Sequence, residues 1–103
     1  MTRKNIILTT EHFNKWLRKL KDIQAKTRII ARIKNAEKGN FGDVKPVGEG
    51  LSEMRVFIGA GYRIYYTQKE DITYLLLMGG DKSTQKQDIA KAKRMAKELG
   101  LLP

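Results

Sequence analysis

Cysteine is absent from this 103-residue sequence, and His12 is its single histidine. The lack of thiols excludes a disulfide framework and a thiolate metal site, and a single imidazole excludes a metal cluster built from several histidines. Apolar runs are also short. The run at residues 5–9 is too short for a signal peptide, and no run reaches the roughly 20 apolar residues of a membrane helix. We therefore expect a cytoplasmic protein that does not enter a membrane.

Acidic residues are the other scarce class, because 11 Asp and Glu stand against 21 Lys and Arg and leave a formal charge of +10. The surplus is concentrated in residues 1–38, which hold 11 basic and 3 acidic residues. Such a charge indicates a polyanionic partner, either a nucleic acid or an acidic protein. The alternative is a solvated, self-repelling surface that only aids solubility.

The length fits one domain covering residues 1–103. We predict a strand at residues 5–9, a helix capped by Thr10, and a second helix that is capped by Asp22 and ends at Gly39. The few residues between the helices predict an antiparallel pair. Positions at helical spacing are expected to face inward: Phe13, Trp16, Leu17, Leu20, Ile23, Ile29, Ile30, Ile33 and Ala36. The outer faces are expected to carry most of the positive charge: Lys15, Arg18, Lys19, Lys26, Arg28, Arg32 and Lys34.

The second part of the chain predicts strands joined by hairpin-length turns, at residues 44–47, 51–58, 62–68 and 72–78. Pro46 places the first of them at an edge of the sheet, and the apolar run 72–78 is typical of a strand buried on both faces. The glycines that follow are expected to end that strand. Ser83 can then cap a last helix over residues 84–99, which Gly100 ends. The residues of this helix expected to face inward are Ile89, Ala92, Ala96 and Leu99.

The order of the predicted elements is one strand, two helices, four strands and one helix. This order indicates the α+β class, with an N-terminal strand and an antiparallel helical hairpin packed on a sheet. The sheet is expected to have four to five strands, mainly antiparallel, and a C-terminal helix closes the chain. No repeat, linker or second domain is indicated.

The hairpin S-E-M-R-V-F-I-G-A-G-Y-R-I-Y-Y-T, residues 52–67, carries one arginine on each arm. Alternation places Glu53 and Arg55 on one face of the first arm, and Arg63 and Tyr65 on one face of the second. When the arms pair, Arg55 and Arg63 can lie side by side, which is unfavourable for like charges unless an anion or Glu53 compensates. The alternative is an ordinary solvent-facing strand with weak surface ion pairs.

A third basic residue, Lys82, follows the buried strand in G-G-D-K, just before a helix N-terminus. Helix N-termini attract anions. We therefore predict that Arg55, Arg63 and Lys82 converge on one phosphate group, and that neither arginine lies in the core. His12 lies on the first helix, away from this hairpin, and is interpreted as a structural or surface residue.

Residues 52–67, together with L-L-L-M-G-G-D-K-S-T-Q-K-Q-D-I-A-K-A-K at residues 75–93, resemble the RelE/ParE toxin superfamily. More narrowly, they are similar to the HigB-like addiction module killer proteins of bacterial type II toxin–antitoxin systems. The resemblance covers nearly the whole chain. Its most specific elements are Y-R-I-Y-Y and G-G-D-K-S-T-Q-K-Q-D-I.

The resemblance implies a toxin that is an endoribonuclease and cuts mRNA in the ribosomal A site without a metal or other cofactor. In this family the 2′-hydroxyl of the RNA attacks the adjacent phosphate, and basic side chains on the sheet stabilise the developing charge. The implied partners are mRNA, the ribosome and a cognate helix-turn-helix antitoxin. The resemblance implies that the toxin contacts operator DNA only through that antitoxin.

By the same resemblance, Arg63 matches the family's central sheet arginine, Arg55 the basic position of the preceding strand, and Lys82 the basic residue after the last strand. Preorganised cations stabilise a pentacovalent phosphate more than the ground state. The family's archetype has a tyrosine in the last helix, where this chain has Q-K-Q-D-I. Glu53 and Asp88 are therefore the candidate acceptors for the 2′-hydroxyl proton, and a helix-end charge is the alternative for Asp88. Further RNA contacts are expected from Lys45, Tyr65, Gln85 and Lys86, and packing in the core or the sheet is the alternative for Tyr65.

Two other functions stay open. A ParE-like toxin has the same fold but inhibits DNA gyrase without nuclease activity, and its working surface would be the basic helical hairpin. An inactive relative would only bind its antitoxin. The three predicted cations argue against the first alternative, and nothing in the sequence argues against the second.

Overall fold

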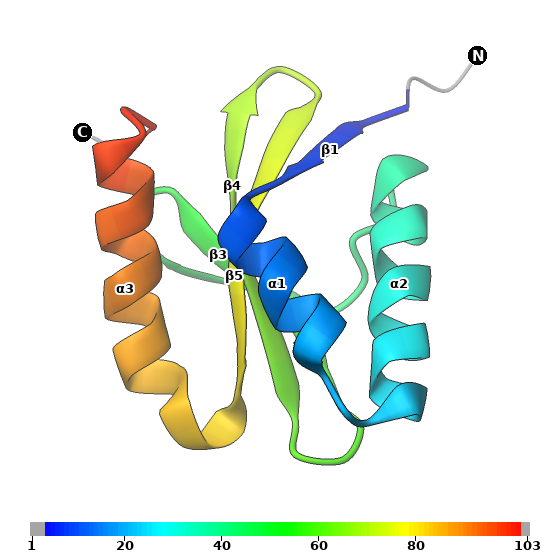
Figure 1. The fold of residues 1–103 in the computed structure, drawn as a ribbon. Helices are drawn as coiled ribbons and strands as arrows, with labels where there is room; N and C mark the ends of the chain where they lie inside the picture. The colour runs from blue at the N-terminus through cyan, green and yellow to red at the C-terminus, as the bar shows by residue number, and fades with distance from the viewer. Residues whose placement is uncertain (1–3, 102–103) are drawn as a thin grey trace.

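A computed structural model describes residues 4–101, in which a five-stranded sheet has helices on both faces (Figure 1). The order of the elements is the predicted one. No helix among these residues is long and apolar enough to cross a bilayer. The elements are β1 (Ile6–Thr9), α1 (Glu11–Lys19), α2 (Ile23–Glu37), β2 (Val44–Gly48), β3 (Leu51–Val56), β4 (Tyr62–Glu70), β5 (Thr73–Asp81), the 3₁₀ turn η1 (Lys82–Thr84) and α3 (Gln85–Glu98).

The strands lie in the order β1-β5-β4-β3-β2, with β1 parallel to β5 and all other neighbours antiparallel. This arrangement confirms the mainly antiparallel sheet and places β2, which contains Pro46, at an edge. The apolar strand β5 is internal. Helix α1 packs on one of its faces and α3 on the other, which confirms a strand buried on both faces.

The first two helices begin at the predicted caps, and α2 ends at Glu37, just before the predicted Gly39. The hydroxyl of Thr10 accepts a hydrogen bond from the Phe13 amide at 3.0 Å, and the Asp22 carboxylate accepts one from the Ala25 amide at 3.1 Å. Each bond satisfies one of the free N–H groups at a helix start. Gly39, which follows α2, has φ +96°, a left-handed conformation that favours glycine at a helix end.

The last helix begins differently from the prediction that Ser83 caps it. Thr84 stands at the N-cap position of α3 without a side-chain capping bond, and Asp81 caps the preceding 3₁₀ turn, where its carboxylate accepts from the Ser83 amide at 2.8 Å and from the Ser83 hydroxyl at 2.5 Å. These bonds lower the pKa of Asp81. They also form the 3₁₀ turn that precedes α3, so Ser83 donates instead of capping.

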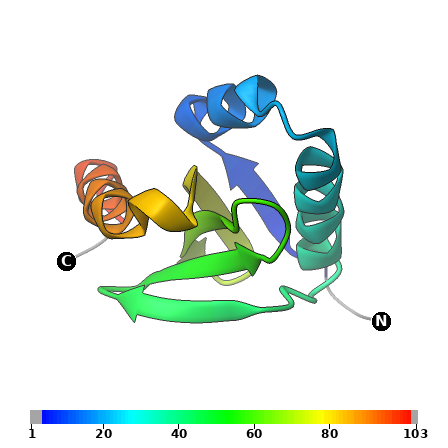
Figure 2. The same ribbon diagram turned by 90° about the horizontal axis from the view of Figure 1, so that it is seen from below.

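Helices α1 and α2 run in opposite senses but are splayed (Figures 1 and 2). Their opposite senses agree with the predicted antiparallel pair, and each helix packs on the sheet, α1 against β5 and α2 against β1 and β3. Three positions expected to face inward are open to solvent. Ile23 is 69% exposed and Ile30 is also exposed, contrary to the prediction, as is Leu99 beyond the end of α3.

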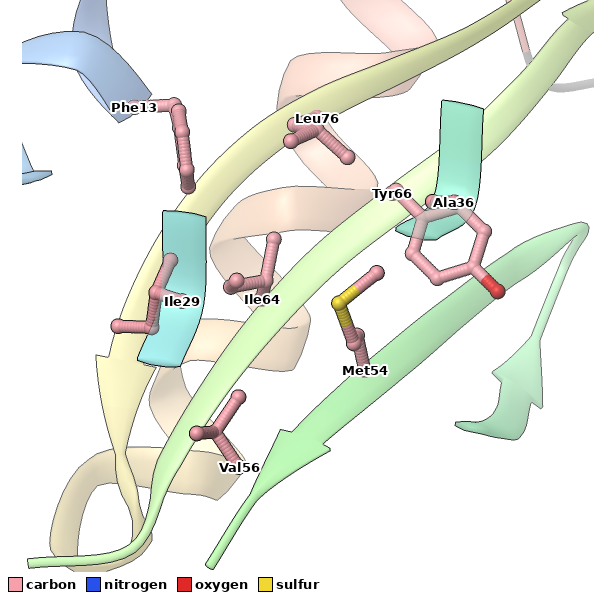
Figure 3. Packing of buried hydrophobic residues seen from close by; sticks show 8 residues of the cluster. All are labelled: Phe13, Ile29, Ala36, Met54, Val56, Ile64, Tyr66 and Leu76. Atoms are coloured by element: carbon pink, nitrogen blue, oxygen red, sulfur yellow. The ribbon is translucent and has the colours of Figure 1, made fainter. Parts of the chain in front are cut away.

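The core consists of two apolar clusters, one on each face of the sheet. The cluster under α1 and α2 is shown in Figure 3 and contains Phe13, Ile29, Ala36, Met54, Val56, Ile64, Tyr66 and Leu76. The cluster under α3 contains Leu51, Tyr65, Leu77, Met78, Ala92 and Ala96. Because side chains alternate along β4, the neighbours Tyr65 and Tyr66 enter different clusters.

Two glycines expected to end β5 are part of it. Gly79 pairs with Ile64 and Gly80 pairs with Arg63, and the strand continues to Asp81. A Cβ on Gly79 would stand 2.4 Å from the Trp16 indole, and one on Gly80 would stand 2.0 Å from the Asp88 carboxylate. These two glycines do not end the strand. They allow α1 and α3 to approach it closely, which is another reason for glycine within a strand.

Gly79→Ala should lower the free energy of unfolding by roughly 1–3 kcal/mol, the usual cost of overpacking a filled core. The added methyl group would force the Trp16 indole, and α1 with it, away from the sheet. Thermal unfolding followed by circular dichroism measures the loss. As a control, Trp16→Leu should recover part of the stability in the Gly79→Ala background. An unchanged melting temperature of Gly79→Ala would contradict the close contact.

Candidate functional site

The two arginines of the β3–β4 hairpin lie directly opposite each other. Arg55 pairs with Arg63 in the antiparallel register, and Glu53 pairs with Tyr65 two residues further along each strand. Residues paired in this way share a face of the sheet. The structure therefore confirms the predicted placement of these four residues on one face, and α3 covers part of that face.

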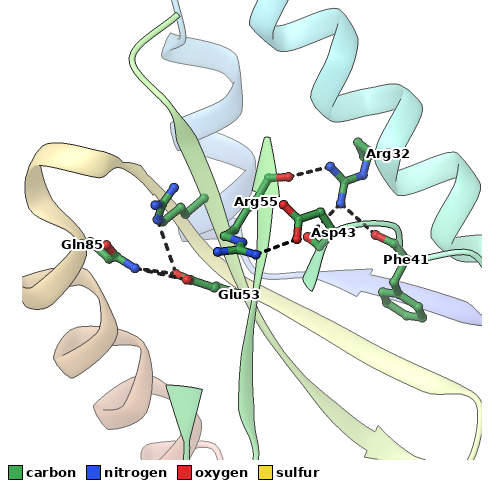
Figure 4. A network of polar contacts seen from close by, with 7 residues as sticks. Arg32, Phe41, Asp43, Glu53, Arg55 and Gln85 are labelled. Carbon is green, nitrogen blue, oxygen red and sulfur yellow. Dashed lines mark hydrogen bonds and ion pairs between the residues drawn. The ribbon is translucent and has the colours of Figure 1, made fainter. Parts of the chain in front are cut away.

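Each arginine has its own carboxylate. Arg55 donates from Nη2 to Oδ1 of Asp43 at 2.8 Å (Figure 4), and this hydrogen bond raises the pKa of Arg55. Nε of Arg63 lies 3.6 Å from Oε2 of Glu53. The protein itself thus compensates the like charges of the two strands, so their proximity alone does not require a bound anion.

Asp43 is held in place by Arg32 (Figure 4). Arg32 donates to the carbonyl oxygens of Arg55 at 2.6 Å, Phe41 at 2.8 Å and Asp43 at 3.2 Å. Burial lowers the pKa of Arg32. The prediction that Arg32 lies on an outer helix face is therefore wrong, because its guanidinium fixes the turn that brings Asp43 to Arg55.

Arg63 is buried, against the prediction that neither arginine lies in the interior. It is 8% exposed, and Glu53 is 1% exposed. Gln85 at the start of α3 donates from Nε2 to both carboxylate oxygens of Glu53, at 3.1 and 3.0 Å (Figure 4). Within residues 4–101, the guanidinium of Arg63 makes no hydrogen bond to the protein. The ion pair occupies its Nε side, so its terminal nitrogens are free to bind a ligand.

Arg63 borders a pocket of about 300 Å³ at the end of the hairpin. Lys82 borders the same pocket, because Asp81 pairs with Tyr62 and so sets Lys82 beside Gly61. Arg55 is not among its lining residues. We call it the Arg63 pocket; it is lined by Phe57, Ile58, Gly59, Ala60, Gly61, Arg63 and Lys82. The structure thus brings two of the three predicted cations together and directs the third, Arg55, towards Asp43.

A larger pocket, of about 530 Å³, lies between α2 and the hairpin turn. It is lined by Ile23, Gln24, Thr27, Arg28, Ala31 and Ile58. Arg28 is its single ionisable residue. Convergent charges identify a site for an anion better than volume does, so the Arg63 pocket is the candidate site.

The two candidate proton acceptors differ in their surroundings. The Glu53 carboxylate is buried, accepts from Gln85 and faces Arg63, and is thereby shielded from a ligand in the pocket. Asp88 is partly exposed and lies over Gly80, the residue that pairs with Arg63. The Thr84 hydroxyl donates to it at 2.6 Å. Neither carboxylate is among the lining residues of the Arg63 pocket, and Asp88 is the less buried of the two.

The four residues predicted to contact RNA differ in their exposure to solvent. Tyr65 is 0% exposed beneath α3, its hydroxyl has no partner in the described part of the chain, and burial raises its pKa. Its ring is out of reach of a base, which corrects its predicted role. Gln85 is engaged with Glu53. Lys45, opposite Glu53 on β2, and Lys86 on α3 are exposed.

His12 is exposed on α1, as expected for a surface histidine. Partial burial lowers its pKa, and the positive charges of Lys91 and Lys15 lower it further. It borders a separate pocket with Lys15, Trp16 and Lys19. The Arg63 pocket does not include it.

Three residues of the site were not identified from the sequence. Asp43 and Arg32 are brought to Arg55 by the turn after α2, and the acidic residue in N-F-G-D was the available signal for the first of them. Phe57 is the third. It is 67% exposed at the pocket, and its position two residues after Arg55 was the available signal.

Comparison with known proteins finds one family model that matches most of the chain. Residues 15–98 match the model described as phage derived protein Gp49-like (DUF891). A similar protein from Haemophilus influenzae, described as an uncharacterized protein, is 52% identical over 95 residues, which are 92% of this chain and 96% of that protein. The matched range includes every residue that lines the Arg63 pocket.

Proposed function

The chain belongs to the phage-derived Gp49-like family, and from this membership, the resemblance to HigB-like toxins and the Arg63 pocket we propose that it is a type II toxin that cuts mRNA. The finer assignment, to the RelE/ParE superfamily, is part of this proposal. One observation carries it: Arg63 is paired with Glu53 through its Nε side, its guanidinium makes no hydrogen bond within residues 4–101, and Arg63 and Lys82 line the same pocket.

In the proposed reaction the scissile phosphate lies at the Arg63 pocket. The 2′-oxygen forms a bond to phosphorus, the bond to the 5′-oxygen breaks, and a 2′,3′-cyclic phosphate and a 5′-hydroxyl result. The 2′-hydroxyl proton passes to Asp88, and the departing 5′-oxygen takes a proton from water. Arg63 and Lys82 stabilise the charge that builds on the phosphate oxygens, where fixed donors act most strongly.

The proposed partners are mRNA on the ribosome and a cognate helix-turn-helix antitoxin. The charge of +10 supports both, because a basic surface attracts RNA and also an acidic protein segment. An antitoxin that neutralises this toxin would cover the Arg63 pocket or occupy the basic surface of α1 and α2. Operator DNA would be reached through the antitoxin.

Induced expression without the antitoxin should arrest bacterial growth and stop translation before replication. The measurement is a map of mRNA 5′ ends before and after induction, which should show new ends that carry a 5′-hydroxyl. Co-expression of the antitoxin should restore growth. Lys82→Ala is the control, and it should reduce the number of new ends because one of the two cations at the pocket is removed.

Two outcomes would replace this proposal. Failure of replication or supercoiling while mRNA stays intact would assign the chain to gyrase-inhibiting, ParE-like toxins. Normal growth with intact mRNA, from a chain that still binds its antitoxin, would assign it to inactive relatives.

A further inference from the structure

Phe57 is an exposed aromatic residue at the mouth of a cationic pocket. Its side chain is 67% exposed, although a ring of this size is usually buried in a domain core. It lines the Arg63 pocket together with Arg63 and Lys82. An apolar ring in this position contributes little to the core, and it is accessible to a molecule bound in the pocket.

The guanidinium of Arg55 packs against the ring of Phe57. The guanidinium carbon of Arg55 lies 5.5 Å from the ring centroid, within the range of a cation–π contact. Asp43 fixes the same guanidinium at 2.8 Å, and Arg32 fixes Asp43 through its backbone carbonyl. One face of the Phe57 ring is thus covered by an anchored cation, and most of the ring surface remains open to solvent.

The turn that follows Phe57 is also well defined. The Ile58 amide donates to the Val56 carbonyl at 3.0 Å, and the Gly61 amide donates to the Ile58 carbonyl at 3.0 Å. Gly59 has φ +54°, and its α-carbon lies so close to the Asp22 carboxylate that a Cβ would stand 2.8 Å from it. The turn therefore holds Phe57 at the pocket before any ligand binds.

We propose that Phe57 is a stacking platform for the nucleobase next to the phosphate held by Arg63 and Lys82. Single-stranded RNA is commonly bound by aromatic side chains on which unpaired bases stack, beside basic groups that hold the backbone. The Arg63 pocket has both components, because Phe57, Arg63 and Lys82 are all among its lining residues. Arg55 is then a positioning residue that supports the ring, and it does not hold the phosphate. This inference rests on the proposed function, since it assumes that the ligand is RNA.

The test measures binding to two fluorescein-labelled probes at fixed salt. One is a 2′-O-methyl hexauridylate, which cannot be cut because its 2′-oxygen is blocked. The other is the matching hexamer without bases, which keeps the same phosphates. Phe57→Ala should weaken binding of the hexauridylate roughly 5- to 150-fold, the range for loss of one stacked base, and leave the abasic probe unchanged.

Two matched variants complete the experiment. Phe57→Trp should keep or improve binding of the hexauridylate, because indole is also a stacking surface. Lys82→Ala should weaken both probes alike and reduce the salt dependence of binding by about one phosphate contact. Because Phe57 is mostly exposed, all variants at this position should melt near the wild-type temperature, which circular dichroism verifies.

The outcomes separate this inference from the proposed function. If Phe57→Ala weakens binding of both probes equally, or weakens binding of neither probe, the stacking role is overturned. Unchanged binding of both probes by Lys82→Ala and by Arg63→Met overturns the phosphate site. Even then, weaker binding of only the hexauridylate by Phe57→Ala would still support base stacking on this ring.

Discussion

Arg63→Ala should reduce the rate of mRNA cleavage roughly 10²–10³-fold, a loss of about 2.7–4 kcal/mol of transition-state stabilisation. The reason is that the unpaired end of its guanidinium is the donor best placed to meet charge developing on a phosphate in the pocket. The measurement is the single-turnover cleavage rate on the ribosome. Arg63→Lys should recover part of the rate, because an ammonium group lacks the paired donors of a guanidinium.

The control for this prediction is stability, because Arg63 is also the ion-pair partner of buried Glu53. Arg63→Ala leaves that carboxylate uncompensated, so part of an apparent loss of activity could come from unfolding. Arg63→Met combined with Glu53→Met removes both charges and should be folded but inactive. Cleavage at the wild-type rate by this double variant would show that the site lies elsewhere.

Glu53→Ala should lower the free energy of unfolding by roughly 3 kcal/mol, the lower end of the cost of breaking a buried ion pair. The change leaves Arg63 unpaired and deprives the Gln85 amide of its acceptor. The lower end applies because the free end of Arg63 still meets solvent at the pocket. For a domain of this size the melting temperature should fall by roughly 12–24 °C.

Denaturant unfolding at neutral pH measures this loss, with Lys45→Ala as the matched control on the neighbouring strand. Lys45 is exposed opposite Glu53, so its removal should change stability little. The doubly apolar variant described above should regain most of the stability, because well-packed hydrophobic residues often replace a buried pair without loss. A Glu53→Ala variant that unfolds like the wild type would show that the pair is solvated.

The sequence by itself determined the order of the elements and the local features that depend on a few neighbouring residues. Thr10 and Asp22 cap their helices, Gly39 ends the second helix, and the alternation of residues 52–67 sets Arg55 beside Arg63. These features follow from backbone hydrogen bonding and from side-chain periodicity. Both act over a few residues, so they can be predicted without knowledge of the fold.

The tertiary structure alone decided which partners these residues meet. Asp43 reaches Arg55 because Arg32 holds the intervening turn, and Tyr65 is buried because α3 covers the second face of the sheet. Gly79 stays in its strand because the indole of Trp16 occupies the space above it. Contacts of this kind join segments far apart in the chain, and no local pattern records them. These contacts give the two paired arginines different partners. Arg63 lines a pocket with Lys82, whereas Arg55 lies against the ring of Phe57.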